Sequence, residues 1–406
     1  MISANVADNR AQTTAAHAAE KVAHFPATRF EPLRCELKVI STVVEFDAAR
    51  SQWVKFLQRP TVECDFFTDP HEIQRHVAYD RGDRLLLGQV FRGGHLVAIV
   101  PLIWRRVRTP VRFGLVTVCR LSIRAARLVN FEFPREPGVD PFDVFAKVVE
   151  ACAGLKHLAD LLFVDSVPVQ SQSGREHGFR IDDIQSSYII EIEGSFESYI
   201  HDFSPKSRKN LMRTIRKLSE TASQPVRAVS FRTPAEMDSL YPALRKVYEK
   251  SWQGRLSRQP LPSATHLRAL AAQGWIRSYV LFVGDQPIAS LRGFQYGNTF
   301  HYFAPAYDSD WQEHSPGTVL LYHLIKDLFA VDSPARLDFG FSYNQYKQVF
   351  GTHEVMRGTI GLGVTARGKL VVNLQAVSTT LFRLFKAALG PTGIPRLIKR
   401  KMRQGR

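Results

Sequence analysis

The chain has 406 residues, of which 45% are hydrophobic and 23% charged, an ordinary composition for a globular protein long enough for two domains. Its 54 Lys and Arg outnumber its 38 Asp and Glu, and the formal charge of +16 favours an acidic partner: phosphates, nucleic acid or an anionic membrane surface. No apolar run reaches the roughly 18 residues of a membrane span, and the N-terminus does not resemble a signal peptide. We therefore expect a cytoplasmic protein, with peripheral attachment to a membrane as a further option.

Residues 1–34 are predicted to form a flexible polar lead-in, and strand and helix signals begin after it. Apolar residues 85–91 and 96–103 flank a Gly93-Gly94 turn, which predicts two antiparallel strands. A helix over residues 141–155 and a strand within LADLLFVDSV follow. The four cysteines lie far apart and match no metal or redox pattern, so we expect reduced thiols and no metal site.

The same order returns in the second half of the chain. Residues 279–283, 288–294 and 299–304 are predicted strands, separated by turns at Gly284-Asp285 and Gly297-Asn298. A helix over residues 316–330 and a strand within ARLDFGF follow. Antiparallel strands, a helix and a further strand, twice over, predict an α+β protein with two similar domains. We place them at residues 35–172 and 173–375, with a basic amphipathic tail at 376–406.

A strongly basic helix is predicted between the two copies, within residues 201–220. Ser204 followed by Pro205 is a typical helix start. Helical spacing puts the apolar residues on one stripe and the basic ones opposite: Leu211, Met212, Ile215 and Leu218 against Lys206, Lys209, Arg213, Arg216 and Lys217. The basic face is either simply solvated or a wall beside an anionic ligand, and the repulsion among its charges favours a phosphate-bearing ligand.

Another helix start offers a place for phosphate. Ser315 is a predicted N-cap, Pro316 takes the first helical position, and Gly317 and Thr318 follow. Unpaired backbone N–H groups at a helix start suit a pyrophosphate, and a glycine lets it approach the backbone. A simple helix cap without a ligand is the alternative.

Residues from about 200 to 350 resemble the FemAB-like branch of the GNAT acyltransferase superfamily. The similarity is carried by SPKSRKNLMRTIRKL, VYEKSW, VLFVGDQPIASLRGF, HSPGTVLLYHLI and LDFGFSYNQYKQVFG, and by their order. More narrowly, these pieces resemble acetyltransferases of cellulose and exopolysaccharide biosynthesis. The resemblance implies tandem GNAT-like domains, each a mostly antiparallel mixed sheet flanked by helices. It also implies an acyl-CoA donor, acetyl-CoA or a longer one, whose pyrophosphate lies at Ser315, Gly317 and Thr318, although the usual glycine-rich loop of the superfamily is absent.

Candidate catalytic residues lie near the end of this region. Asp338 is expected on the fifth strand of the domain, where a carboxylate could accept the proton of an attacking amine. Lys347 resembles the lysine of the Lys-x-x-Phe-Gly motif of the FemAB relatives and could contact a donor phosphate or the thioester oxygen. Tyr346 could protonate the leaving thiolate. Each has a structural alternative: Asp338 could cap the next loop, Lys347 could be a surface lysine, and Tyr346 could serve only in packing.

Four other residues are expected on the substrate side of the cleft. Arg292 could pair with Asp338 or bind an anionic substrate, and Trp252 could form a sugar platform. The others, His301 and Tyr302, lie on the predicted strand over residues 299–304. Packing is the alternative role for all four.

Three functions compete. The first is an acyl-CoA-dependent N-acyltransferase that acts on an amine, such as an amino sugar or a cell-envelope or exopolysaccharide precursor. The second uses aminoacyl-tRNA as donor and a peptidoglycan precursor as acceptor, and it is the only one in which nucleic acid is expected as a partner. The third is a non-catalytic protein that binds anionic surfaces.

The C-terminal tail adds a possible membrane contact. Residues 378–389 are rich in Leu and Phe, and six Lys and Arg follow in the last eleven residues. Apolar residues followed by a basic cluster are typical of an anchor on the inner face of an anionic membrane. The alternative is a last helix docked on the protein, with a solvated basic end.

Overall fold

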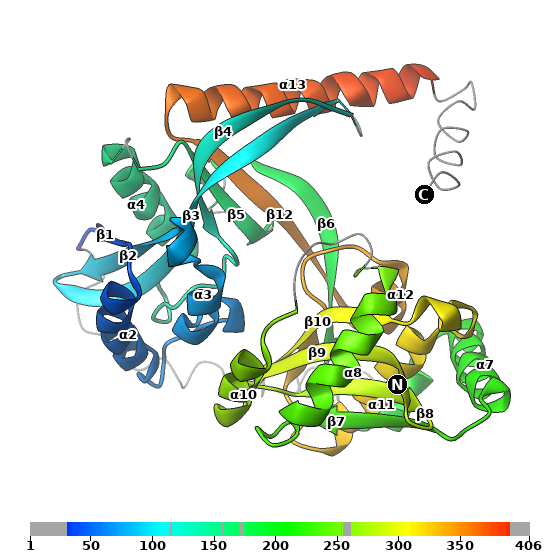
Figure 1. Ribbon diagram of the computed structural model, residues 1–406. Coiled ribbons are helices and arrows are strands. Elements are labelled where there is room, and N and C mark those ends of the chain that lie inside the picture. The colour runs from blue at the N-terminus through cyan, green and yellow to red at the C-terminus, as the bar shows by residue number, and fades with distance from the viewer. Residues whose placement is uncertain are drawn as a thin grey trace, which may run out of the picture.

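A computed structural model describes residues 31–113, 116–155, 158–169, 174, 176–252, 254 and 261–389. Within them, one 12-stranded sheet runs through the molecule in the order β1-β2-β3-β4-β5-β12-β6-β11-β10-β9-β8-β7. Figure 1 shows an N-terminal lobe on the left and a C-terminal lobe at the lower right, with the long strands β6 and β12 running between them. The α+β fold with two similar halves is therefore confirmed.

The elements of the first half begin with β1 and end with β5. They are β1 (Arg34–Ile40), α2 (Val43–Leu57), η2 (Phe66–Thr68), α3 (Pro70–His76), η3 (Tyr79–Arg81), β2 (Arg84–Arg92), β3 (His95–Phe113), β4 (Val116–Leu128), α4 (Pro141–Gly154) and β5 (Leu161–Pro168).

The second half continues to the last described helix. Its elements are β6 (Ile181–Glu191), α6 (Phe196–His201), α7 (Pro205–Thr221), β7 (Val226–Phe231), α8 (Met237–Lys250), α10 (Ala264–Ala272), β8 (Ser278–Val283), β9 (Gln286–Tyr296), β10 (Thr299–Tyr307), η4 (Ser309–His314), α11 (Pro316–Ala330), β11 (Arg336–Asp338), α12 (Gln345–Phe350), β12 (His353–Gly363) and α13 (Ala366–Leu389).

The two halves share one pairing pattern. In each, four antiparallel strands lead to one parallel pair, β4 with β5 and β10 with β11. Between the parallel pairs, β12 and β6 continue the sheet in antiparallel fashion. Strand β12 pairs with β5 of the first half, and its Ile360 belongs to the core of that half. The domain boundaries at 172/173 and 375/376 stay a prediction, and the two halves are joined by more than a linker.

Helices cover both faces of the C-terminal sheet. Helix α11 packs with α6 and α7 over β8, β9 and β10, and α8 and α10 lie on the other face. The C-terminal end of α11 is fixed by the fully buried Arg277, which donates to the Asp327 carboxylate at 2.9 Å and to the Val331 carbonyl at 2.7 Å. Because the end of α11 is fixed, its start has a defined position beside β10.

A loop of the first half inserts into the second. Phe66 stacks on Phe294 of β9 with ring centroids 4.3 Å apart, and it belongs to the same buried cluster. Nearby, the Tyr296 hydroxyl donates to the Asp69 carboxylate at 2.9 Å. These contacts fix η2 and α3 against one face of β9 and β10.

Most predicted elements are confirmed, α11 with the predicted bounds and most others within a few residues, whereas β3 continues to Phe113, well beyond the predicted end at residue 103. For α7, Ser204 is the predicted cap and accepts from the Ser207 N–H at 3.1 Å. Its apolar stripe is narrower than predicted, because Met212 is 40% exposed. After Gly351, His353–Gly363 forms a single long strand.

The C-terminal region forms one long helix, α13, which Figure 1 shows lying along the β3–β4 hairpin. Val371 of α13 is fully buried and clusters with Ile123 of β4 and Leu161 of β5. The basic residues predicted as an anchor, 390–406, lie outside the described residues. Across the described part of the chain, no helix combines the length and the apolar character needed to span a bilayer.

Candidate functional site

The candidate site lies where two parallel strands separate. β10 and β11 pair over only three positions, the last of which joins His301 to Asp338. Beyond it β11 ends, whereas β10 continues to Tyr307. Backbone groups of β10 are thereby left without a neighbouring strand on this side, so an extended ligand could lie along them.

A bulge in β10 marks the middle of the site. The register against β9 shifts between Phe303 and Ala306, and Ala304 has a positive φ of 47°. Such a bulge disrupts the ladder and redirects the backbone. Pro305 and Ser290 border small cavities on both faces of the sheet here.

One of these cavities, of about 20 Å³, lies on the α11 face. It is lined by Tyr302, Tyr307 and Gly317, together with leucines of α11 and β9. The lining of this crevice is mostly apolar and ends at a helix start, while the cavity itself has room for only one or two water-sized groups.

The predicted phosphate-binding residues lie at that helix start. Ser315 is the N-cap in a left-handed conformation, with φ 49°, but its side chain makes no capping hydrogen bond. Its carbonyl accepts from the Thr318 N–H at 3.0 Å. A Cβ placed on Gly317 would meet only Tyr307, at 3.8 Å, so the space above the helix start is open.

The basic face of α7 lies beside this helix start. α7 contacts both α11 and η4, and Lys217 donates to the Glu313 carbonyl at 3.3 Å. The five basic side chains predicted for this face are all exposed. Because Lys217 contacts Glu313, a few residues before Gly317, the positive potential of this face extends to the start of α11.

Asp338 forms an ion pair that the sequence did not indicate. Its carboxylate lies 3.1 Å from the Arg357 guanidinium on β12, and it accepts from the Gly340 N–H at 2.7 Å. Burial would raise the pKa of Asp338, but Arg357, the Gly340 N–H and the nearby His301 outweigh it and hold the pKa below its usual value. The carboxylate is thus ionised at neutral pH, and its partner makes it a weaker base. Its role as general base stays a prediction.

Lys347 is buried and points into the loop after β11. Its ammonium group donates to the Phe339 carbonyl at 2.8 Å and to the Ser342 carbonyl and hydroxyl at 3.1 and 2.9 Å. Burial lowers the pKa of Lys347 to about 8, which Asp338 partly opposes. These contacts fix the loop. The predicted contact with the donor stays a prediction, and it would require Lys347 to exchange one of them.

Two tyrosines meet on the α11 face. The rings of Tyr302 and Tyr346 lie 6.2 Å apart, Phe339 packs against both, and the two hydroxyls interact. Burial raises the pKa of both hydroxyls, so each keeps its proton at neutral pH. A protonated Tyr346 beside the crevice fits the predicted proton donor.

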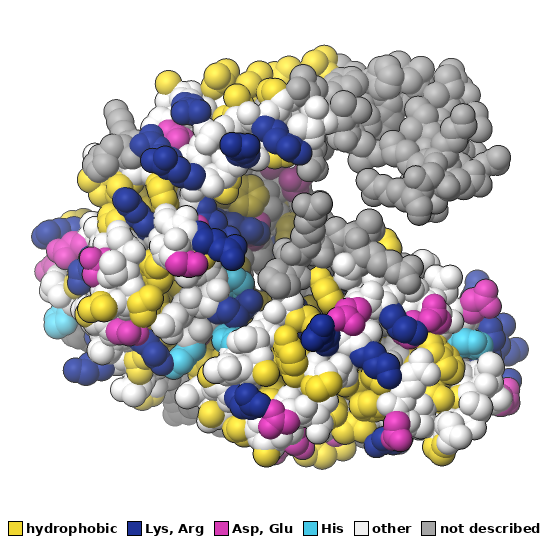
Figure 2. Space-filling model, viewed as in Figure 1, with side chains coloured by type: hydrophobic (Ala, Val, Ile, Leu, Met, Phe, Trp, Pro, Cys, Tyr) yellow, Lys and Arg dark blue, Asp and Glu magenta, His cyan; other side chains and the backbone are white. Residues whose placement is uncertain are grey.

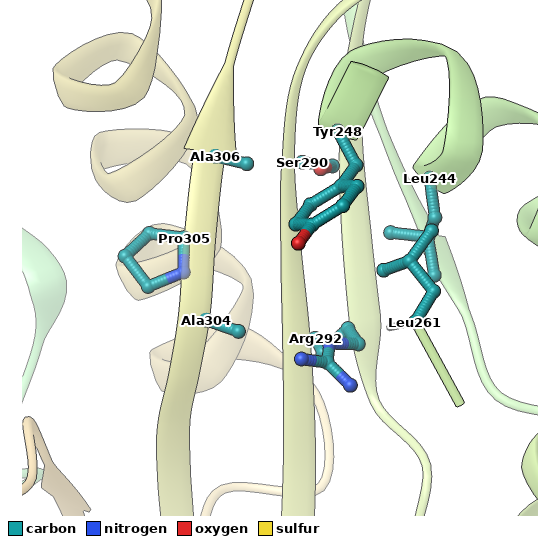
Figure 3. Close-up of a pocket in the computed structure, with 8 residues that line it drawn as sticks. All are labelled: Leu244, Tyr248, Leu261, Ser290, Arg292, Ala304, Pro305 and Ala306. Atoms are coloured by element: carbon teal, nitrogen blue, oxygen red, sulfur yellow. The ribbon is translucent and has the colours of Figure 1, made fainter. Parts of the chain in front are cut away.

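The second cavity, of about 50 Å³, lies on the opposite face of the bulge (Figure 3). Arg292 points into it and is stacked over Phe303, 5.1 Å from the ring centroid. Tyr248 and Leu261 form the wall opposite, and neither was predicted. The signal available for Tyr248 was its place in VYEKSW, four residues before Trp252.

The other two predicted substrate residues lie elsewhere. His301 is buried against the rings of Phe66 and Phe67, with Nδ1 3.9 Å from the Asp65 carboxylate, so it faces the inserted loop of the first half. Trp252 is 64% exposed and does not line the cavity. Arg292 and Asp338 do not pair, because Arg357 occupies the carboxylate. The described residues hold no group of three or more His, Cys, Asp or Glu that could bind a metal.

Comparison with known proteins supports an acyltransferase site in this region of the chain. Residues 205–348 match the family profile described as acetyltransferase (GNAT) domain, which runs from α7 into α12 and contains all the predicted site residues, whereas Arg357 lies outside it. No curated protein sequence matches the chain.

Solved structures share the fold over both halves. The crystal structure of FemX matches with a TM-score of 0.53 at 11% identity, covering 80% of this chain and 98% of FemX. The C-terminal domain (DUF2156) of a putative lysylphosphatidylglycerol synthetase from Agrobacterium fabrum matches with a TM-score of 0.50 at 9% identity, covering 82% of this chain and 96% of that one. At these identities the likeness shows the fold. The family match goes further: residues 205–348 carry a GNAT acetyltransferase domain, which supports an acyltransferase enzyme.

Proposed function

We propose that the protein transfers an acyl group from acyl-CoA to an amine at the separation of β10 and β11. One observation carries this proposal: within the GNAT-matched region, the free edge of β10 leads from the bulge toward the open start of α11. The apolar lining of the crevice is chemically suited to the pantetheine arm of the donor, and the crevice would have to widen to admit it. The helix start and the basic face of α7 suit its phosphates.

The chemistry would be a direct transfer. The amine nitrogen attacks the thioester carbonyl carbon, a C–N bond forms, and collapse of the tetrahedral intermediate breaks the C–S bond. Tyr346 gives its proton to the leaving thiolate, and the amine releases its proton to Asp338, directly or through a water molecule. Asp338 pairs with His301 of β10, whereas Tyr346 packs against Tyr302, the next residue of that strand. Because adjacent residues of a strand point to opposite faces, Asp338 as base and Tyr346 as acid would act from opposite faces of the sheet.

We propose an amino sugar or another cell-envelope or exopolysaccharide precursor as the acceptor, on the resemblance in sequence alone. The resemblance of the sequence to the FemAB-like branch keeps the alternative of an aminoacyl-tRNA donor and a peptidoglycan precursor open. The two donors differ in charge, and tRNA binding would depend steeply on salt.

We also propose that α13 and the basic tail hold the enzyme on the inner face of an anionic membrane. Four apolar side chains of α13 are exposed at helical spacing: Leu370 54%, Leu374 36%, Val377 55% and Leu381 51%. Figure 2 shows hydrophobic side chains along the outer edge of this helix. The same view shows Lys and Arg side chains clustered below them. An apolar stripe beside basic groups is typical of interfacial helices.

Vesicle co-sedimentation tests the membrane proposal. We expect pelleting with anionic vesicles, less with neutral ones, and a marked loss when residues 391–406 are removed or Leu374 and Leu381 are both changed to Ser. Equal pelleting of all variants, or none at low salt, would exclude it.

Calorimetry tests the donor. Acetyl-CoA should bind the full-length chain, and desulfo-CoA, which keeps all phosphates, should bind as well. Acetylation of amines should then be followed by mass spectrometry. Absence of acetyl-CoA binding together with salt-sensitive tRNA binding would favour the alternative donor.

A further inference from the structure

Arg292 stands out among the basic residues of the C-terminal half because its half-buried guanidinium lines a cavity and has no ion-pair partner among the described residues. No hydrogen bond or ion pair joins its guanidinium to any described residue. The guanidinium stacks instead on the ring of Phe303. Partial removal of a cation from water without a counterion costs free energy, and a bound anion would offset that cost.

The surroundings of Arg292 add positive charge and do not neutralise it. Burial and the neighbouring Arg75 lower the pKa of Arg292 to about 10. The Glu72 carboxylate opposes this effect and raises the pKa of Arg292. That carboxylate is, however, already bound by Arg75, by His76 at 3.0 Å and by His266 at 3.4 Å.

The neighbouring chain cannot supply the missing charge. Residues 253–260, next to the cavity wall at Leu261, contain no Asp or Glu. The cavity of about 50 Å³ has room for several water-sized groups.

We infer that this cavity is the acceptor subsite and that it binds an anionic group, carboxylate or phosphate, carried by the amine substrate. The inference rests on the proposed function, because it takes the amine to react at the nearby strand separation. Arg292 would donate its N–H groups to the anion, which is the geometry that guanidinium groups favour.

The sheet register sets the size of the acceptor. Arg292 pairs with Phe303, and His301, two residues earlier on β10, pairs with Asp338. With strands ~4.8 Å apart and a rise of ~3.4 Å per residue, the Cα atoms of Arg292 and Asp338 are about 12 Å apart. Side chains reach inward from both ends, so the amine and the anion would lie on one molecule of about monosaccharide size.

Three related amino sugars test the inference: glucosamine, glucosamine 6-phosphate and muramic acid. They share the amine, and they carry no anionic group, a phosphate and a carboxylate, respectively. Binding should be measured by calorimetry on the full-length chain, with and without CoA. We expect at least one anionic sugar to bind about 10- to 100-fold more tightly than glucosamine, as charge-assisted hydrogen bonds do. The preferred sugar then distinguishes phosphate from carboxylate.

The variant Arg292→Gln should remove this preference, so that the anionic sugars bind it no more tightly than glucosamine does. Arg292→Lys should keep part of it. Arg227→Gln is the matched control, because it removes an exposed arginine paired with Asp285 on the distant edge of the sheet. Arg292→Gln should fold with an equal or higher midpoint of thermal unfolding, since it removes an uncompensated charge.

Phosphate provides a check that does not depend on the sugar. Inorganic phosphate, compared with chloride at matched ionic strength, should raise the unfolding midpoint of the wild type more than that of Arg292→Gln. Equal shifts in both, or equal affinity for all three sugars, would overturn the anion subsite. The proposed function would stand in that case if acetyl-CoA binds and amines are acetylated. Conversely, an anion preference without acetyl-CoA binding would contradict the proposed function and leave the subsite.

Discussion

Replacing Asp338 by Asn separates its structural role from its chemical one. Asn keeps the shape of the side chain and can still accept from the Gly340 N–H, but it leaves the Arg357 charge without its partner. The side chains of Asp338 and Arg357 are only 13% and 16% exposed. Breaking a buried ion pair costs about 3 to 5 kcal/mol, and the residual exposure here favours about 3 kcal/mol.

A loss of this size should lower the midpoint of thermal unfolding by about 6 to 12 °C if the C-terminal half unfolds as a unit of about 200 residues. The rate of acetyl transfer should fall by about 10²-fold or more if Asp338 is also the general base. The two effects are separated by the double variant Asp338→Asn/Arg357→Gln, which removes both charges. We expect it to regain at least about 1.5 kcal/mol relative to the sum of the single variants.

If the double variant regains stability but not the rate of acetyl transfer, the result would confirm Asp338 as the general base. Recovery of both would make Asp338 a purely structural residue. The reasoning about the ion pair would be refuted if the two single variants each cost less than about 0.5 kcal/mol and their effects were additive. Since the pKa of Asp338 is lowered in the folded protein, its contribution is present above the ordinary aspartate pKa of about 4 and is lost as the pH falls below it.

Three further variants test the rest of the site. Gly317→Val should weaken acetyl-CoA binding by 10-fold or more without loss of fold, since the added side chain enters open space at the helix start, and Gly317→Ala should do less; unchanged affinity in calorimetry would remove this helix start from the site. Tyr346→Phe should lower the turnover number by about 10²-fold with little change in donor affinity, and full turnover would exclude it as the proton donor. Lys347→Met should destabilise the fold by about 1 to 3 kcal/mol, because buried carbonyls lose their donor. Because the folded pKa of Lys347 is about 8, below its ordinary value, the wild type should gain stability relative to this variant as the pH rises from about 8 to about 10, and a constant difference would mean that the carbonyls keep Lys347 protonated.

Local signals in the sequence predicted the scaffold of the site well. A Ser-Pro cap located α7, the Pro-Gly start located α11 with both of its ends, and glycine turns located β8, β9 and β10. Each of these depends on residues a few positions apart, where backbone preference is decisive.

Contacts between distant segments could not be predicted in this way. Arg357 pairs with Asp338 only because β12 is inserted into the sheet next to β6. Phe66 reaches β9 from the other half of the chain, and this contact buries His301, which the sequence placed on the substrate side. The burial of Lys347 likewise follows from the path of the loop after β11, which no periodicity encodes.

Hydrogen–deuterium exchange with and without acetyl-CoA tests the central claim most directly, since it reports where the donor binds. We predict slower exchange in two peptides, one covering the free end of β10 at residues 302–307 and one covering the start of α11 at residues 315–321. The variant Gly317→Val should show much less of this protection at the same acetyl-CoA concentration. Protection confined to the N-terminal half, or none in either peptide at a concentration that saturates acetylation, would contradict the donor site proposed at the separation of β10 and β11.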